Sequence, residues 1–148
     1  MAFRFSLEAV LRLRQGQERS ERLKLEAIVS EQAQARANLE EIMDRSCELH
    51  RQFLQQMRNG MVGSELQIEA ERGTNVNLVC KSLSTRLLDL EQQRIKQLQI
   101  FLKVRQSREV LENLRLRKLK LYRSEQSRRE QQILDDLFLM RQAKTNEE

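Results

Sequence analysis

Proline is absent from this chain of 148 residues, and three of its four glycines lie in one short stretch. These three are Gly60, Gly63 and Gly73, while Gly16 stands alone near the start. Proline and glycine interrupt helices most strongly, whereas the Leu, Gln, Glu, Arg and Lys that fill the remainder favour them. The distribution predicts an all-α fold in which two long helices fold back at Asn59–Gly63 as an antiparallel coiled-coil hairpin.

The composition fits a thin seam between two helices rather than a thick globular core. Aromatic residues make up 4% of the chain, charged residues 33% and hydrophobic residues 39%, and tryptophan is absent. Charged, Leu-rich compositions with helical periodicity are typical of coiled coils. The apolar fraction and its regular spacing argue against a disordered chain. We therefore expect one domain, residues 1–148, whose function lies on its surface and at its ends.

The first arm is predicted to span residues 6–58, with Ser6 as its N-cap and Glu8 in its first turn. Its seam positions follow spacings of three and four, and seven of the ten are apolar: Leu25, Ile28, Gln32, Ala35, Leu39, Ile42, Ser46, Leu49, Phe53 and Gln56. The same frame extends backward to Glu21, Glu18, Arg14, Leu11 and Leu7. Because this part is polar from Arg14 to Glu21 and contains Gly16, we expect a weak point or a shift of frame there.

The second arm is predicted to span residues 64–142, after a turn at residues 59–63. Ser64 and Gln67 form a capping-box pattern at its start. Gly73 predicts either a kink or a break that separates a short helix, 65–72, from a long one, 76–142. The remaining residues, 143–148, are predicted to be a disordered tail.

The apolar stripe of the second arm drifts and is interrupted by Arg94, Arg105 and Arg108. Its members are Val76, Val79, Leu83, Leu87, Leu90, Leu98, Phe101, Leu102, Leu111, Leu114, Leu121, Ile133, Leu137 and Met140. We therefore expect this arm to pack less regularly than the first.

The two arms differ in length, which predicts an unpartnered end. Equal helical rise on both sides of a turn near residue 61 places residue 7 opposite about residue 115. Residues from there to 142 should overhang, and they include the apolar run Ile133–Met140. Exposed apolar segments usually mark partner sites, so a partner contact is expected there. Self-association and a fold-back onto the N-terminus are the alternatives.

The overhang begins with a basic cluster, which carries most of the excess behind the net charge of +5. The cluster consists of Arg115, Arg117, Lys118, Lys120, Arg123, Arg128 and Arg129. These cations suit an acidic protein surface, nucleic acid or an anionic membrane, or are simply solvated. Only Tyr122 is interleaved among them, so there is no platform on which bases would stack.

No constellation for catalysis is present, and we expect no enzyme activity, no metal site and no cofactor. His50 is the single histidine and lacks Asp or Cys at a spacing that completes a triad or metal site. Cys47 and Cys80 also lack metal spacing and are expected to be reduced, partly buried thiols. No phosphate-binding glycine loop occurs.

The chain is expected to be cytoplasmic. It contains no apolar run on the order of 18 residues that would span a membrane. Its first residues, Met1–Ser6, lack the apolar core of a secretory signal.

The opening Phe3-x-Phe5-x-Leu7-x-x-Val10-Leu11-x-x-Arg14 resembles the start of the flagellar export protein FliJ family. Met57–Ser64 is similar to the hairpin turn of that family, and Ile42, Asp44, Glu48 and Leu49 fit its helix pattern. The resemblance extends over the whole chain in length, basic character and architecture. It implies a non-catalytic, stalk-like component of the flagellar type III export apparatus, peripheral at the inner face of the cell membrane.

The resemblance also implies two partner sites. The end with both termini would bind the hexameric export ATPase, and the turn end would bind the export gate protein FlhA; export chaperones are further partners. The ATPase-binding residues would be Phe3, Phe5, Leu7, Leu11, Arg14, Arg115, Lys118, Arg123 and Arg128. The gate-binding residues would be Asn38, Ile42, Arg45, Leu49, Val76, Val79 and Leu83. A basic coiled coil that binds nucleic acid or a membrane surface is the alternative function.

Overall fold

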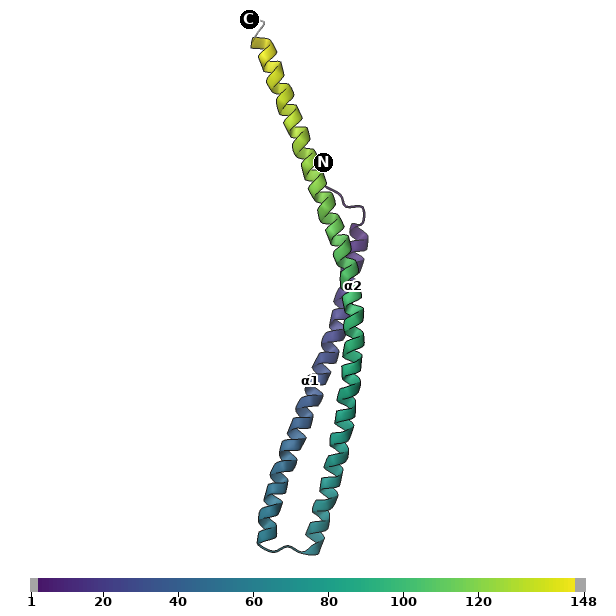
Figure 1. The fold of residues 1–148 in the computed structure, drawn as a ribbon, viewed down its shortest axis with the longest axis vertical. Helices are drawn as coiled ribbons and strands as arrows, with labels where there is room; N and C mark the ends of the chain where they lie inside the picture. Colours follow the sequence, from purple (N-terminus) through teal and green to yellow (C-terminus); the bar gives the residue numbers. More distant parts are fainter. Residues whose placement is uncertain (1–2, 146–148) are drawn as a thin grey trace. The chain divides into compact units, whose positions relative to one another are not determined.

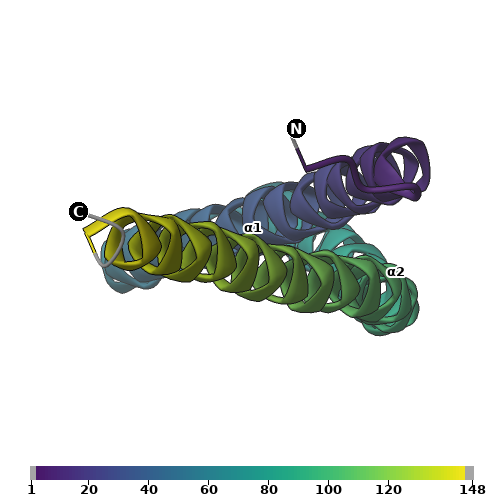
Figure 2. The same cartoon turned by 90° about the horizontal axis from the view of Figure 1, so that it is seen from above.

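Two helices form nearly all of the structure, a computed structural model that describes residues 3–145 (Figure 1, Figure 2). Helix α1 spans Glu8–Arg58 and has 51 residues, and α2 spans Gly63–Thr145 and has 83. No strand occurs among residues 3–145. The all-α class and the two long helices that fold back at residues 59–63 are confirmed.

The turn between the helices depends on Gly60. The Asn59 N–H donates to the Gln56 carbonyl at 2.9 Å, and the Gly60 N–H donates to the Met57 carbonyl at 3.2 Å. Gly60 then adopts a φ of 94°, in the left-handed region that glycine enters without a steric penalty. This residue reverses the chain at the point that the sequence predicted.

Both helix starts differ from the predicted ones. Helix α2 begins one residue earlier, and its cap involves Val62 and Glu65 rather than Ser64 and Gln67. The Glu65 N–H donates to the Val62 carbonyl at 3.0 Å, and the Val62 N–H donates to Glu65 Oε2 at 3.4 Å. Helix α1 begins at Glu8, two residues after the predicted Ser6. There the Glu8 N–H donates to the carbonyl of Phe5, whose buried side chain holds the preceding segment in a turn.

The chain divides into two compact units, each of which contains parts of both helices. The terminal unit contains the described residues up to Glu18 and from Lys103 on, and the hairpin unit contains Arg19–Leu102. Within each unit α1 and α2 run antiparallel and contact each other along a seam (Figure 1).

The predicted seam of α1 is confirmed except at Gln56, which is exposed. Its less exposed residues are Leu7, Leu11, Arg14, Glu18, Glu21, Leu25, Ile28, Gln32, Ala35, Leu39, Ile42, Ser46, Leu49 and Phe53. The expected shift of frame near Gly16 is wrong, because α1 is continuous there and the three-and-four spacing persists. Of the polar seam positions in this stretch, Glu18 and Glu21 have polar partners on α2, namely Arg108 and Gln97, whereas Arg14 bonds Gln17 of α1.

The apolar stripe of α2 drifts away from the seam of that helix, and the seam is less regular than that of α1. Spacings of four and three, alternating except for two consecutive fours from Leu111 to Leu119, join the seam residues of α2: Val76, Cys80, Leu83, Leu87, Leu90, Arg94, Gln97, Phe101, Val104, Arg108, Leu111, Arg115, Leu119, Tyr122 and Gln126. Arg94 and Arg108 belong to this seam, whereas Val79, Leu102 and Leu121 are exposed outside it. Arginine is tolerated on the seam because each guanidinium meets a carboxylate: Arg94 bonds Glu91, and Arg108 bonds residues of both helices.

Gly73 does not interrupt α2, so the separate short helix at 65–72 is wrong. The Thr74 hydroxyl donates to the Ala70 carbonyl at 3.0 Å across this part of the helix. A single glycine costs a helix only about 1 kcal/mol, which the surrounding helix formers offset. Helix α2 also includes residues 143–145 of the predicted disordered tail, and residues 146–148 lie outside the described part of the chain.

The predicted register is confirmed, but the overhang begins near residue 127 rather than residue 115, because the N-terminal segment packs on the part of α2 between them. In the terminal unit Arg115 Nε lies 3.4 Å from Glu8 Oε2, so the start of α1 faces the expected part of α2. The Phe3 and Tyr122 rings, 5.6 Å apart between centroids, form a contact further toward the end. Residues 127–142 of α2 are exposed throughout.

Candidate functional site

The nine residues expected to bind an ATPase all lie in the terminal unit, but two of them are buried within it. Phe5 is 8% exposed and Leu11 is 2% exposed. Among residues 3–142, whose side-chain exposure the structure describes, only Ala35 and Leu90 are apolar side chains of comparable burial. Phe5 and Leu11 therefore stabilise the contact between α1 and α2 rather than form an open surface.

Aromatic and cationic side chains fasten the N-terminal segment to α2. Phe3 packs on Tyr122, and Lys118 Nζ lies 5.7 Å from the centre of the Phe5 ring, a cation–π contact. The buried Nε of Arg115 lies within ion-pair distance of Glu8 Oε2 but forms no hydrogen bond with it or with another acceptor. These contacts position Phe3, Phe5, Arg115 and Lys118 together, as the sequence predicted for one end of the molecule.

The same segment borders a hollow of about 520 Å³. Its walls are formed by Phe3, Arg4, Phe5, Ser6, Glu8, Arg12 and Arg115. Sequence reasoning missed Arg4 and Arg12, although the four-residue spacing of Glu8 and Arg12 is a signal for their ion pair, observed at 3.9 Å. With three arginines and one glutamate, the hollow favours an acidic group of a partner.

The other four expected residues differ in accessibility. Leu7 is half-buried, and Arg14, also half-buried, donates to Gln17 Oε1 at 3.0 Å. Arg123 and Arg128 are exposed, and no carboxylate among residues 3–145 pairs with either. Of the nine residues, these two arginines are thus the most available to an acidic partner.

A polar section of the seam lies next to the buried Leu11. Arg108 Nε donates to Glu18 Oε2 across the helices at 2.7 Å, and its Nη1 pairs with Glu112. Its side chain is 21% exposed. The hydrogen bonds that Arg108 donates to Glu18 and, second, to Glu112 raise the pKa of Arg108, so its positive charge is fixed.

The hairpin unit contains two comparable bonds across the seam. Gln97 Nε2 donates to Glu21 Oε2 at 2.5 Å, and Lys24 followed by Gln97 lowers the pKa of Glu21. Gln32 Nε2 donates to Glu91 Oε2 at 2.7 Å. Hydrogen bonds from Arg94 first and Gln32 second lower the pKa of Glu91 from 4.5 to about 2. Such bonds between specific partners favour one register of the two helices.

The seven residues expected to bind a gate protein lie together in the hairpin unit, around connected hollows. One hollow, of about 380 Å³, is lined by Asn38, Glu41, Ile42, Arg45, Val79 and Leu83. The next, of about 480 Å³, shares Ile42 and Val79 with it and adds Ile68, Glu71, Arg72, Asn75 and Val76. A third, of about 330 Å³, shares Ile68 and Arg72 and continues toward the turn at Met61. The structure thus brings the predicted residues of both arms onto one continuous face.

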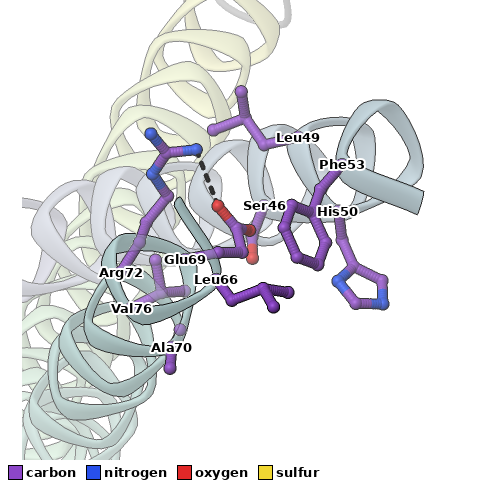
Figure 3. A pocket seen from close by; sticks show the side chains of 10 residues that line it. Ser46, Leu49, His50, Phe53, Leu66, Glu69, Ala70, Arg72 and Val76 are labelled. Atoms are coloured by element: carbon purple, nitrogen blue, oxygen red, sulfur yellow. Dashed lines mark hydrogen bonds and ion pairs between the residues drawn. The ribbon is translucent and has the colours of Figure 1, made fainter. Parts of the chain in front are cut away.

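A further hollow of about 400 Å³ lies on the seam itself near the turn (Figure 3). Figure 3 shows side chains from both helices around it, with Ser46, Leu49, His50 and Phe53 from α1 and Leu66, Glu69, Ala70, Arg72 and Val76 from α2. The Arg72–Glu69 ion pair, 3.0 Å long, lies within this group. This hollow contributes Leu49 and Val76 of the predicted set.

Small residues explain why the seam opens here. Continuing the four-and-three spacing of α2 from Val76 back toward the turn places Gly73 and Glu69 on the seam, with Ala70 beside them. A Cβ built on Gly73 would meet nothing within 4 Å, so the space opposite Ser46 is unfilled. Neither Ile68 nor this opening is predicted from the sequence, in which Gly73 signals only a break or kink of the helix.

The described residues form no metal-binding cluster. Within them no group of three or more His, Cys, Asp or Glu side chains gathers to hold a metal ion. His50 is exposed, with its ring centre 6.4 Å from that of Phe53. Cys47 is exposed and Cys80 lies on the seam of α2, both as free thiols. Over the same residues, neither helix has a stretch long and apolar enough to cross a membrane.

A family model described as "Flagellar FliJ protein" matches residues 3–148 of this chain. No curated protein and no solved structure matches it.

Proposed function

The chain belongs to the FliJ family and is a component of flagellar protein export, and from this premise we propose that it is a non-catalytic, stalk-like coupling protein. Its proposed partners are the hexameric flagellar export ATPase and the export gate protein FlhA, with export chaperones as further partners. It would act in the cytoplasm, peripheral at the inner face of the cell membrane. The observation that carries the proposal is the family match over nearly the whole chain.

The terminal unit supports the ATPase contact. It contains the N-terminal aromatic segment, the mixed-charge hollow and the unpaired Arg123 and Arg128. The exposed part of α2 at residues 127–142 adds apolar side chains, among them Ile133, Leu137 and Phe138, each more than half exposed. A surface of this composition suits a partner with acidic and apolar groups.

The hairpin unit supports the gate contact. Its connected hollows expose apolar walls at Ile68, 59% exposed, and Val79, 46% exposed. Ion pairs such as Arg45–Glu41 at 3.2 Å border the same face. An apolar groove with a charged border is the usual pattern of a protein interface.

The test is a titration of the organism's export ATPase with this chain, measuring complex formation and ATP turnover. The double variant R123Q/R128Q should bind the ATPase about tenfold more weakly, because it loses two exposed charges that steer association. The control K81Q/K96Q loses the same charge from exposed, unpaired lysines of the hairpin unit and should bind like the unmodified chain.

Two results would contradict the proposal. The first is an unmodified chain that forms no isolable complex and leaves turnover unchanged. The second, for the site alone, is equal binding by R123Q/R128Q and K81Q/K96Q. An alternative nucleic-acid function predicts binding to DNA that weakens steeply with salt, in the absence of an ATPase complex.

A further inference from the structure

Besides its seam, α2 has an exposed stripe in the terminal unit, on a side that α1 does not cover. It consists of Lys103, Val110, Leu114, Arg117 and Leu121, with Lys120 on its border. The spacings of seven, four, three and four place these five residues on one helix face. At 3.6 residues per turn, this outer stripe is turned roughly 130° away from the seam.

The apolar members of the outer stripe have no partner within the terminal unit. Val110 is 62% exposed, Leu121 is 64% exposed and Leu114 is 36% exposed. Together with Lys103 they extend over about 27 Å of helix. Isolated exposed aliphatic residues are common on proteins, but a line of them on one face is an amphipathic pattern.

The cations of the outer stripe are unpaired. Lys103, Arg117 and Lys120 are exposed, and within residues 3–145 none of them lies within ion-pair distance of a carboxylate. This differs from the neighbouring arginines, since Arg105 pairs with Glu109 at 2.8 Å and Arg108 pairs with Glu18. Glu125 is the one carboxylate on the border of the stripe before Asp135. The face therefore offers net positive charge to an anionic partner.

We propose that the outer stripe of α2 binds an anionic phospholipid surface directly. An aliphatic line bordered by lysine and arginine is the arrangement of helices that lie in the membrane interface. The three aliphatic side chains enter the boundary between headgroups and acyl chains, and the long cationic side chains reach the phosphates. Helix α1 packs on a different side of α2, so it leaves this face open to the bilayer.

Lipid explains the aliphatic line better than nucleic acid does. Single-stranded nucleic acid is bound by aromatic stacking, and the outer stripe contains no aromatic residue. Phosphate contacts to a duplex require cations but not exposed valine and leucine between them. The inference also goes beyond the proposed coupling function, because it requires neither the ATPase nor the gate.

The test is co-sedimentation of the full chain with phosphatidylcholine vesicles that contain about one-third phosphatidylglycerol, compared with pure phosphatidylcholine vesicles. The chain should bind the anionic vesicles, and binding should weaken with salt. The variant K103Q/R117Q/K120Q should bind them about 100-fold more weakly, since each cation near an anionic surface contributes about 1 kcal/mol. The control R19Q/K81Q/K96Q removes three exposed, unpaired cations from the hairpin unit and should bind within about threefold of the unmodified chain.

A second variant tests the aliphatic line. V110Q/L121Q keeps every charge and changes only exposed side chains, so it should fold normally and bind anionic vesicles about tenfold more weakly. Equal binding of both vesicle types, or equal binding by K103Q/R117Q/K120Q and its control, would overturn the proposal. So would a K103Q/R117Q/K120Q variant that loses binding to duplex DNA and retains vesicle binding. Because no ATPase is present, these failures leave the coupling function untouched.

Discussion

Individual charged residues on the seam are explained by the partners that they meet. Arg94 and Gln32 both donate to Glu91, at 3.0 Å and 2.7 Å, and Arg108 donates to Glu18 at 2.7 Å. Each bond replaces contacts with water that the side chain loses in the seam. A charged residue in a heptad position thus fixes which residue lies opposite, which an aliphatic residue does less selectively.

The hydrogen bonds of Glu91 with Arg94 and Gln32 should make the stability of the fold depend on pH. The pKa of Glu91 is about 2 in the folded chain, against 4.5 without these partners. Since the folded pKa is the lower one, the stabilisation is present above pH 4.5 and is lost as the pH falls toward 2. Between these values the melting temperature of E91Q should therefore fall less than that of the unmodified chain. The control E40Q alters an exposed glutamate, and identical pH profiles for E91Q and E40Q would refute the assignment.

At the scale of the helix, the seam of α1 could be read from the sequence and that of α2 could not. In α1 the apolar residues themselves carry the frame, from Leu25 to Phe53. In α2 polar residues such as Gln97 and Arg108 occupy seam positions, while Leu102 and Leu121 lie outside. The apolar residues of α2 alone therefore give a drifting stripe. The seam of α2 becomes clear only from the residues of α1 that its polar members contact.

The candidate sites show the same limit. Residues such as Ile42 and Val79 follow from the family resemblance, and the hollows do gather them. The burial of Leu11 follows from its place on the predicted seam. The burial of Phe5 could not be judged from the sequence, because it depends on how the N-terminal segment packs near Lys118.

Substituting alanine for glycine should have opposite effects on stability inside a helix, at Gly73, and in the turn, at Gly60. G73A should stabilise the chain by about 1 kcal/mol, because Gly73 lies inside α2 and a Cβ there has free space. G60A should destabilise it by about 1 kcal/mol, because Gly60 has a φ of 94°. Urea unfolding followed by circular dichroism measures both, and G16A is the control for a helical glycine away from the opening. A destabilised G73A would show that the open seam needs the glycine.

For the whole molecule, the structure separates residues that hold the helices together from residues that remain available. Seam contacts in the terminal unit reach Tyr122 and Gln126, and residues 127–142 are exposed. A chain that ends after Gln126 should therefore unfold within a few degrees of the full chain. A chain that ends after Glu109 loses Arg115, Lys118 and Tyr122 and should unfold at a distinctly lower temperature. Differential scanning calorimetry compares the two, and equal losses would mean that the terminal segment of α2 has a contact within the fold after all.

The loose seam beside the turn has a consequence for how the chain emerges from the ribosome. Residues near Gly60 meet first, but they surround unfilled hollows and provide little stabilisation. The first well-buried seam residue of α2 is Leu90, and the bonds Arg86–Glu31 and Glu91–Gln32 flank it. We therefore expect stable pairing of α1 with α2 to begin once this stretch has been synthesised. Until then the many charged side chains of α1 favour its solubility. Pairing of the two helices in the nascent chain is thus expected to start in this middle stretch rather than at the turn.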